Sequence, residues 1–203
     1  MKFVLSLALI SFMTFAATAK PAAVAAPAPK PITYKVDPSA SKVEWVAYKL
    51  TGQHTGTVNI KAGSLEFNGD KLIAGKLEMD MTALAVTDIQ GEWGTKLLNH
   101  LKTDDFFSVD KFPSSGLTVK KAESRGAGKY FVTADLTIKG ITKEISFDAL
   151  INAAAGTATA DLKVDRTWFD IKYRSGKFFP EIGDKMIKDE FDLKVNLSFG
   201  KGL

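Results

Sequence analysis

Cysteine is absent from the 203 residues, which excludes disulfide cross-links, a cysteine-linked lipid anchor, thiol catalysis and cysteine-ligated zinc. Histidine is nearly absent as well, since the chain has only His54 and His100. No Gly-x-Ser-x-Gly motif is present, and the two histidines lack the His-x-x-x-His spacing typical of metal sites. We therefore predict a protein that is not an enzyme, with no metal and no cofactor. The alternative is a metal-dependent hydrolase that uses His54 and His100.

A large charge excess is also missing. Lysine and arginine number 27 and aspartate and glutamate 23, which gives a net charge of +4. The lysines alternate with acidic residues instead of forming a basic patch, so no nucleic-acid partner is expected. The glycine-rich segment 126–129 is too short for a phosphate-binding loop and predicts a hairpin turn.

Long apolar runs are missing beyond the first 20 residues. At the N-terminus, Lys2 precedes an apolar run over 3–16, and Ala17-Thr18-Ala19 has the small-x-small pattern that signal peptidase cleaves. This predicts a signal peptide over 1–19 and a periplasmic protein; the alternative, a membrane anchor, would need a longer run. An Ala/Pro-rich linker over 20–32 should follow, and then one domain over 33–203.

What the chain does have is alternation of apolar and polar residues, the pattern of a strand with one dry and one wet face. Strands of this kind belong to antiparallel sheets, and Gly-containing turns separate them. An all-β fold is predicted, a closed barrel of about eight antiparallel strands. The predicted strands are 42–50, 56–68, 72–82, 116–122, 129–139, 143–152, 157–167 and 190–199.

One region breaks this alternation. Between 91 and 107, Trp93, Leu97, Leu98 and Leu101 recur at helical spacing, which predicts one short helix region beside or across the barrel.

Small residues on the apolar side of the strands predict a barrel that leaves space in its interior. The alternative is that they only make room for the large aromatic residues in a solid core. These small residues are Ala47, Gly75, Ala134, Ala149, Ala158 and Ala160.

A ligand-binding wall is predicted from strand parity, helical face and the loop after the seventh predicted strand. The residues are Trp45, Leu77, Met79, Leu98, Leu101, Phe106, Phe147 and Trp168. The loop over 166–190 mixes aromatic and basic residues, and from its composition we place Tyr173 and Arg174 near a ligand head group. The alternative is a loop that packs its own aromatic residues as a lid.

Several of these segments together resemble the YceI-like family. The most specific are His100–Phe107 (HLKTDDFF) and Asp135–Lys143 (DLTIKGITK). Shorter matches follow the same order along the chain: Tyr34-x-Val36-Asp37, Val43-x-Trp45, His54-x-Gly56, Asp165-Arg166 and Gly183-Asp184.

The resemblance implies an extended, lipocalin-like, eight-stranded antiparallel barrel in the periplasm. It also implies that the barrel holds a polyisoprenoid or another long-chain amphiphile, as a lipid carrier or a stress-linked protein, with His54 and His100 in polar family motifs. The chain departs from the family pattern in two places. Lys96–Asn99 stands where the family usually has Arg-Asp before the His-Leu motif, and the loop over 166–190 resembles that of only one branch of the family.

The sequence leaves open whether the barrel forms a homodimer or contacts a membrane transiently. It also leaves open a non-catalytic interaction module with a solid core.

Overall fold

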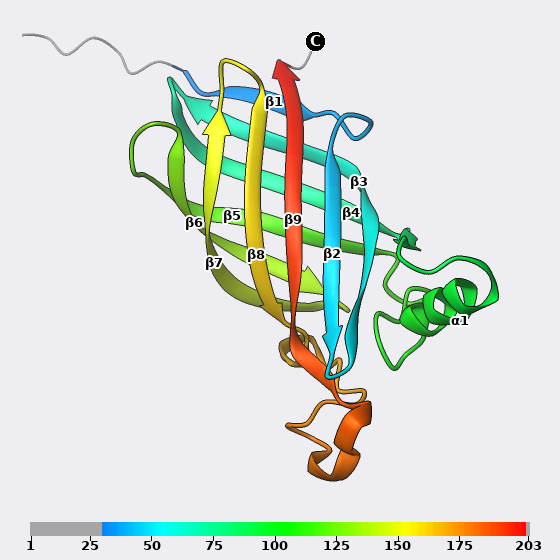
Figure 1. Ribbon diagram of the computed structural model, residues 1–203. Helices are drawn as coiled ribbons and strands as arrows, with labels where there is room; N and C mark the ends of the chain where they lie inside the picture. The colour runs from blue at the N-terminus through cyan, green and yellow to red at the C-terminus, as the bar shows by residue number, and fades with distance from the viewer. Residues whose placement is uncertain (1–29, 202–203) are drawn as a thin grey trace, which may run out of the picture.

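The computed structural model describes residues 30–201 (Figure 1). The predicted signal peptide over 1–19 and most of the predicted linker lie outside the described residues. The described chain forms nine strands and one α-helix. The strands are β1 (Ile32–Val36), β2 (Lys42–Lys49), β3 (Gly52–Asn68), β4 (Lys71–Val86), β5 (Ser114–Ser124), β6 (Lys129–Ile138), β7 (Ile141–Asn152), β8 (Thr157–Asp165) and β9 (Ile187–Lys201). The helix α1 spans Gly91–Lys102, and two 3-10 helices, η1 (Arg166–Phe169) and η2 (Pro180–Lys185), interrupt the connection from β8 to β9.

The nine strands fill eight positions around a closed antiparallel barrel. Their order is β1-β3-β2-β9-β8-β7-β6-β5-β4, and the β3–β4 pairing closes the ring. Both β1 and β2 lie between β3 and β9, since Val36 pairs with Phe199 and Lys42 with Asn196. Between them the chain turns at Asp37, whose carboxylate accepts hydrogen bonds from the Ser39 backbone N–H and hydroxyl at 2.8 and 2.7 Å. The predicted eight-stranded antiparallel barrel is confirmed, and β1 is an addition to it.

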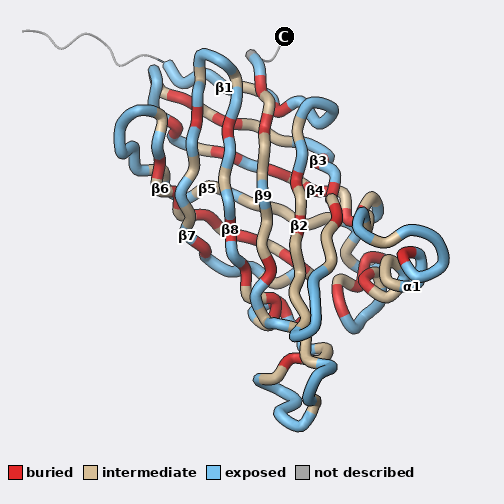
Figure 2. Tube along the Cα trace, viewed as in Figure 1, coloured by how far each residue is buried: buried red, intermediate tan, exposed pale blue. Residues whose placement is uncertain are grey.

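The alternation in sequence becomes alternation in burial. Along β6, Tyr130, Val132, Ala134 and Leu136 are buried, while the residues between them are half-buried. Figure 2 shows the same banding on the other strands of the barrel. The apolar side chains of all strands therefore meet in one core.

The barrel end beside β1 is filled by aromatic rings. Tyr34 contacts Phe67 and Phe199 edge-on, with ring centroids 5.4 and 5.7 Å apart, and Phe67 stacks on Phe199 at 5.9 Å. Offset and edge-to-face contacts of this kind are favourable, and they close this end with apolar surface alone.

The opposite end carries α1 and the long connection between β8 and β9, which projects from the barrel in Figure 1. The predicted short helix region is confirmed: the helix occupies Gly91–Lys102, and turns continue to Phe107. The Thr103 hydroxyl donates to the His100 carbonyl at 2.8 Å, and the N–H of Val109 returns to the Lys102 carbonyl at 2.9 Å. These bonds replace the next helical turn and satisfy the last carbonyls of α1.

The predicted helical face was wrong at one position, because Trp93 is 71% exposed. The packed face of α1 runs instead through Gly94 and Leu101, which are buried. Gly94 lies so close to the chain before the helix that an added Cβ would be 2.4 Å from the Ile89 carbonyl oxygen. Between Lys30 and Lys201, no helix has the length and apolar composition needed to span a bilayer.

Candidate ligand cavity

The barrel interior contains two apolar cavities. The first, of about 110 Å³, lies toward α1 and η1, and we call it the mouth cavity. Its wall includes Trp45, Met79, Leu101, Phe106, Arg166, Ile187, Lys188 and Phe191. The second, of about 70 Å³, lies deeper, and we call it the inner cavity. Its wall includes Gly75, Leu77, Val132, Phe147, Ala149 and Leu197.

The two cavities follow each other along the strands. On β4, Met79 lines the mouth cavity, and Leu77, the next residue on the same face, lines the inner one. On β9, Leu193 and Val195 divide in the same way. Because consecutive inward-facing residues point into adjoining layers of a barrel, the cavities form an elongated apolar lumen.

Small residues create this space. Ala47 lines the mouth cavity, whereas the inner cavity is lined by Gly75, Ala149, Ala158 and Ala160. Ala134, the sixth small residue of the prediction, is fully buried and lines neither. Unfilled space therefore lies beside five of the six small residues.

Six of the eight predicted wall residues line a cavity. They are Trp45, Met79, Leu101 and Phe106 in the mouth cavity, and Leu77 and Phe147 in the inner cavity. Leu98 is half-buried on α1 and packs against the core without lining either. Trp168 lines neither and is 45% exposed, because Arg166 and Phe169 form the buried side of η1.

The two predicted head-group residues lie beside the mouth cavity and do not line it. Tyr173 packs edge-on against His100, with ring centroids 4.7 Å apart, and against Phe106 at 5.4 Å. Arg174 has a backbone φ of 51°, and its guanidinium lies 5.1 Å from the centre of the Tyr173 ring. Tyr173 thus joins the segment between β8 and β9 to α1 at the mouth.

Two cations line the mouth cavity, Lys188 and Arg166, and the sequence analysis predicted neither as a head-group residue. Lys188 is exposed, whereas Arg166 is buried. Its side chain is 6% exposed, and its nitrogens donate to the carbonyls of Ile171, Ile187 and Lys188 at 2.9, 3.0 and 3.0 Å. Asp189 lies 3.5 Å away. Burial lowers the pKa of the guanidinium below its ordinary value. The negative charge of Asp189 acts in the opposite direction and raises this pKa. These carbonyls satisfy a charge that would otherwise be very costly to bury, and they attach η1 to the start of β9. The Asp165-Arg166 motif was the available signal.

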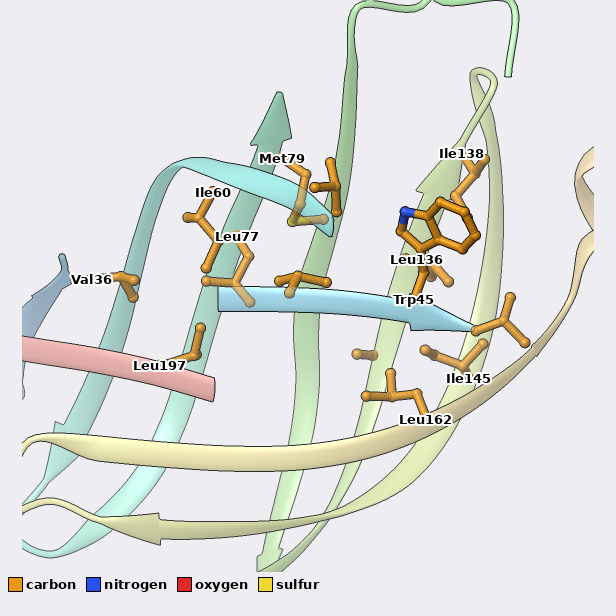
Figure 3. Packing of buried hydrophobic residues seen from close by; sticks show 14 of the residues in the cluster. Val36, Trp45, Ile60, Leu77, Met79, Leu136, Ile138, Ile145, Leu162 and Leu197 are labelled. Atoms are coloured by element: carbon orange, nitrogen blue, oxygen red, sulfur yellow. The ribbon is translucent and has the colours of Figure 1, made fainter. Parts of the chain in front are cut away.

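Trp45 is the one residue of the described chain with a buried side-chain polar atom that lacks a hydrogen-bond partner. Its indole lies close to Gly56, directly opposite on β3, where an added Cβ would be 2.3 Å from the ring. Figure 3 shows Leu136 and Ile138 beside the ring, with its nitrogen on the side toward Met79. All three side chains are apolar and line the same cavity as Trp45.

The two histidines each pair with a different aspartate. His54 Nδ1 lies 2.9 Å from Asp88 Oδ2, and His100 Nε2 lies 2.8 Å from Asp105 Oδ2. Burial favours the neutral acid at Asp88, yet the hydrogen bonds from His54 and the Thr55 N–H lower the pKa of this carboxyl below its ordinary value. No group of three or more histidine, aspartate or glutamate side chains that could hold a metal occurs within the described part of the chain. Both pairs join neighbouring segments.

Comparison with known proteins identifies the family to which the chain belongs. The family model described as YceI-like domain matches residues 34–199. A UPF0312 protein of Shewanella denitrificans is 29% identical over 94 residues, which cover 46% of this chain and 47% of that protein. A UPF0312 protein of Pseudomonas putida is 28% identical over 122 residues, which cover 59% and 62%. The chain therefore spans about half to three fifths of the length of these curated relatives.

Solved structures share the fold. BcnA of Burkholderia cenocepacia superposes with a TM-score of 0.65 at 20% identity, over 80% of this chain and 98% of BcnA. A polyisoprenoid binding domain from Saccharophagus degradans superposes with a TM-score of 0.58 at 14% identity, over 84% and 99%. At these identities the likeness shows the fold alone, a lipocalin-type barrel.

Proposed function

The chain belongs to the YceI-like domain family, and from that premise we propose that it binds a polyisoprenoid or another long-chain amphiphile inside its barrel. The observation that carries this proposal is the elongated apolar lumen formed by the mouth and inner cavities. The polyisoprenoid binding domain from Saccharophagus degradans, which has the same fold, supports it.

A flexible hydrocarbon chain fits such a lumen on energetic grounds. It needs no hydrogen bonds, and each buried methylene contributes about 0.8 kcal/mol. A few isoprene units therefore offset the several kcal/mol lost on association. Since the two cavities are small for a long chain, a ligand has to widen the lumen where they adjoin.

The ligand would enter at the mouth, because aromatic rings fill the other end. Exposed aromatic side chains lie on the projecting connection near lysines: Lys172 and Lys177 lie 5.2 and 6.0 Å from the Phe178 ring, and Phe179 is 49% exposed. Aromatic and basic side chains suit the interface of an anionic membrane, so transient contact there would load or release the ligand. In this proposal the protein is a periplasmic carrier, linked to stress, without catalytic activity.

Organic extraction of the purified mature protein followed by mass spectrometry tests the proposal. We expect an isoprenoid or long-chain amphiphile in a near-stoichiometric amount, and none in the extract of an unrelated exported protein purified in parallel. A blank extract that persists after incubation with membrane lipids would contradict ligand binding and favour an interaction module.

A further inference from the structure

We propose that the ligand carries an uncharged oxygen acceptor, such as a carbonyl, which accepts a hydrogen bond from the indole N–H of Trp45 inside the mouth cavity. This inference rests on the proposed function and makes it more specific, since it assigns the polar group of the ligand and the residue that recognises it.

The indole N–H of Trp45 is a buried donor without an acceptor. Trp45 is 8% exposed, and its Nε1 has no partner among the described residues. A buried N–H without an acceptor costs free energy comparable to a lost hydrogen bond, and native proteins leave few of them. An unpaired donor in the wall of a candidate binding cavity indicates an acceptor supplied by the ligand.

No described residue supplies an acceptor within hydrogen-bonding distance of this nitrogen. Met79, Leu136 and Ile138, which line the same cavity and are labelled near the indole in Figure 3, present only carbon and sulfur. Elsewhere in the core the buried hydroxyl of Tyr130 does find a partner, the Asp70 carbonyl at 2.8 Å. The exception at Trp45 is therefore local to the mouth cavity.

Two cations line the mouth cavity, Arg166 and Lys188. Lys188 is exposed, and its ammonium lies 5.4 Å from the centre of the Tyr48 ring. Three backbone carbonyls and Asp189 already occupy the donors of Arg166, which is buried. An anionic head group at Arg166 would have to displace these contacts or lie beside Asp189. The indole is a neutral donor that needs no counter-charge. A carbonyl, ester, amide or ether oxygen fits this site better than a phosphate or carboxylate.

The position of Trp45 also orients the chain. Trp45 lines the mouth cavity and the inner cavity continues from it, so an oxygen held at Trp45 places the apolar tail in the inner cavity. The ligand would thus lie with its oxygen-bearing end nearer the mouth.

A matched set of ligands tests the proposal. The set is farnesylacetone, its analogue with a methylene in place of the carbonyl, and farnesyl phosphate. Their affinities for the delipidated mature protein are measured by displacement of N-phenyl-1-naphthylamine. For the wild type we expect the ketone to bind about tenfold more tightly than the hydrocarbon, the contribution of one buried hydrogen bond. In Trp45→Phe this preference should disappear, while Trp93→Phe, a change at a residue that is 71% exposed, should keep it.

The outcomes separate this inference from the proposed function. Equal binding of ketone and hydrocarbon to the wild type, or a preference that survives in Trp45→Phe, would overturn the inference and leave ligand binding intact. Tighter binding of farnesyl phosphate would overturn it in favour of an anionic head group. Binding of none of the three would overturn both.

A measurement on the wild type covers the case in which Trp45→Phe fails to fold. The indole ¹H–¹⁵N resonances of the three tryptophans are recorded with each ligand. The Trp93 and Trp168 signals are assigned from their phenylalanine variants, and the remaining signal is that of Trp45. We expect the ketone to shift the Trp45 proton downfield and the hydrocarbon not to do so. Identical spectra with the two ligands would overturn the inference.

Discussion

At the end of the barrel beside β1, three aromatic rings fill the lumen, whereas at the mouth one buried guanidinium holds the covering segment to the barrel. Tyr34, Phe67 and Phe199 contact one another through apolar surface alone. Arg166 instead reaches the carbonyls of Ile187 and Lys188 across the gap between η1 and β9. Packing of rings is non-directional and spread over many contacts, whereas these hydrogen bonds are few and directional.

The two ends differ in the kind of contact and not in burial alone. The covering segment buries Phe169 and Ile171, which are 0% and 1% exposed, beside the hydrogen bonds of Arg166. In the proposed function, ligand exchange through the mouth disturbs these contacts and leaves the aromatic cluster at the other end in place.

The largest effect is expected at the aromatic end. Phe67 is 1% exposed, and Phe67→Ala would leave a cavity among the rings and lower the free energy of unfolding by about 3–5 kcal/mol. Denaturant titration measures the change. Phe178→Ala is the control, since Phe178 is 42% exposed and its loss should cost within about 0.5 kcal/mol. A loss below about 1 kcal/mol in Phe67→Ala would contradict a packed end.

At the mouth, Arg166→Met removes the guanidinium and leaves three carbonyls without their donor. We expect a loss of about 3 kcal/mol in stability and faster ligand release, seen by stopped-flow displacement. The control is Arg125→Met, because Arg125 is 54% exposed and 3.4 Å from Asp148. An unchanged release rate in Arg166→Met would show that these hydrogen bonds do not hold the mouth.

A smaller effect is expected where the lumen narrows. Ala149 lines the inner cavity, so Ala149→Phe should fill that cavity and weaken binding of long isoprenoid alcohols about tenfold, with little change for short ones. Leu150→Phe, the neighbouring residue on the outer face at 52% exposure, is the matched control. Long chains that bind Ala149→Phe as tightly as the wild type would place the ligand elsewhere.

The smallest effect concerns the outer surface. The hydrogen bonds from Lys163 and Tyr48, at 2.8 and 2.6 Å, lower the pKa of Asp192 below its ordinary value of 3.8. A carboxyl whose pKa is lower in the folded state stabilises the fold above pH 4 and loses that contribution as the pH falls through the folded value. Asp192→Asn should therefore cost less than about 1 kcal/mol at pH 7, because the pair is screened by solvent. Urea unfolding at pH 7 and pH 3 should show a smaller cost at the lower pH; a constant difference would contradict the assignment.

Much of the barrel could be predicted because strand alternation is a local signal. Each predicted strand needed only its own residues, and the small inward residues indicated open space. The strand β1 was missed because only Tyr34 and Val36 of its five residues alternate inward, after a Pro-rich stretch. Its pairing with β9 is set by barrel closure, which no short window of sequence contains.

The site was less predictable, because it depends on how loops meet the barrel. Trp45 and Met79 followed from parity. The Asp165-Arg166 motif singles out Arg166, but it does not say that Arg166, and not Arg174, lies at the cavity. Arg166 is buried in η1, whereas Arg174 has a positive φ and its side chain lies over the Tyr173 ring. Tertiary contacts therefore decide which of the two arginines reaches the cavity.

The last strand of the chain also sets the timing of folding. β9 pairs with β1, β2 and β8, so the barrel cannot close until Ile187–Lys201 has been synthesised. Pairing of the first strands with the last is slow, because the entropy of closing the whole chain into a loop opposes it. The barrel therefore stays open while the nascent chain is being synthesised. In the proposed periplasmic function, delayed closure of this kind would suit a polypeptide that crosses a membrane unfolded and completes its fold on the far side.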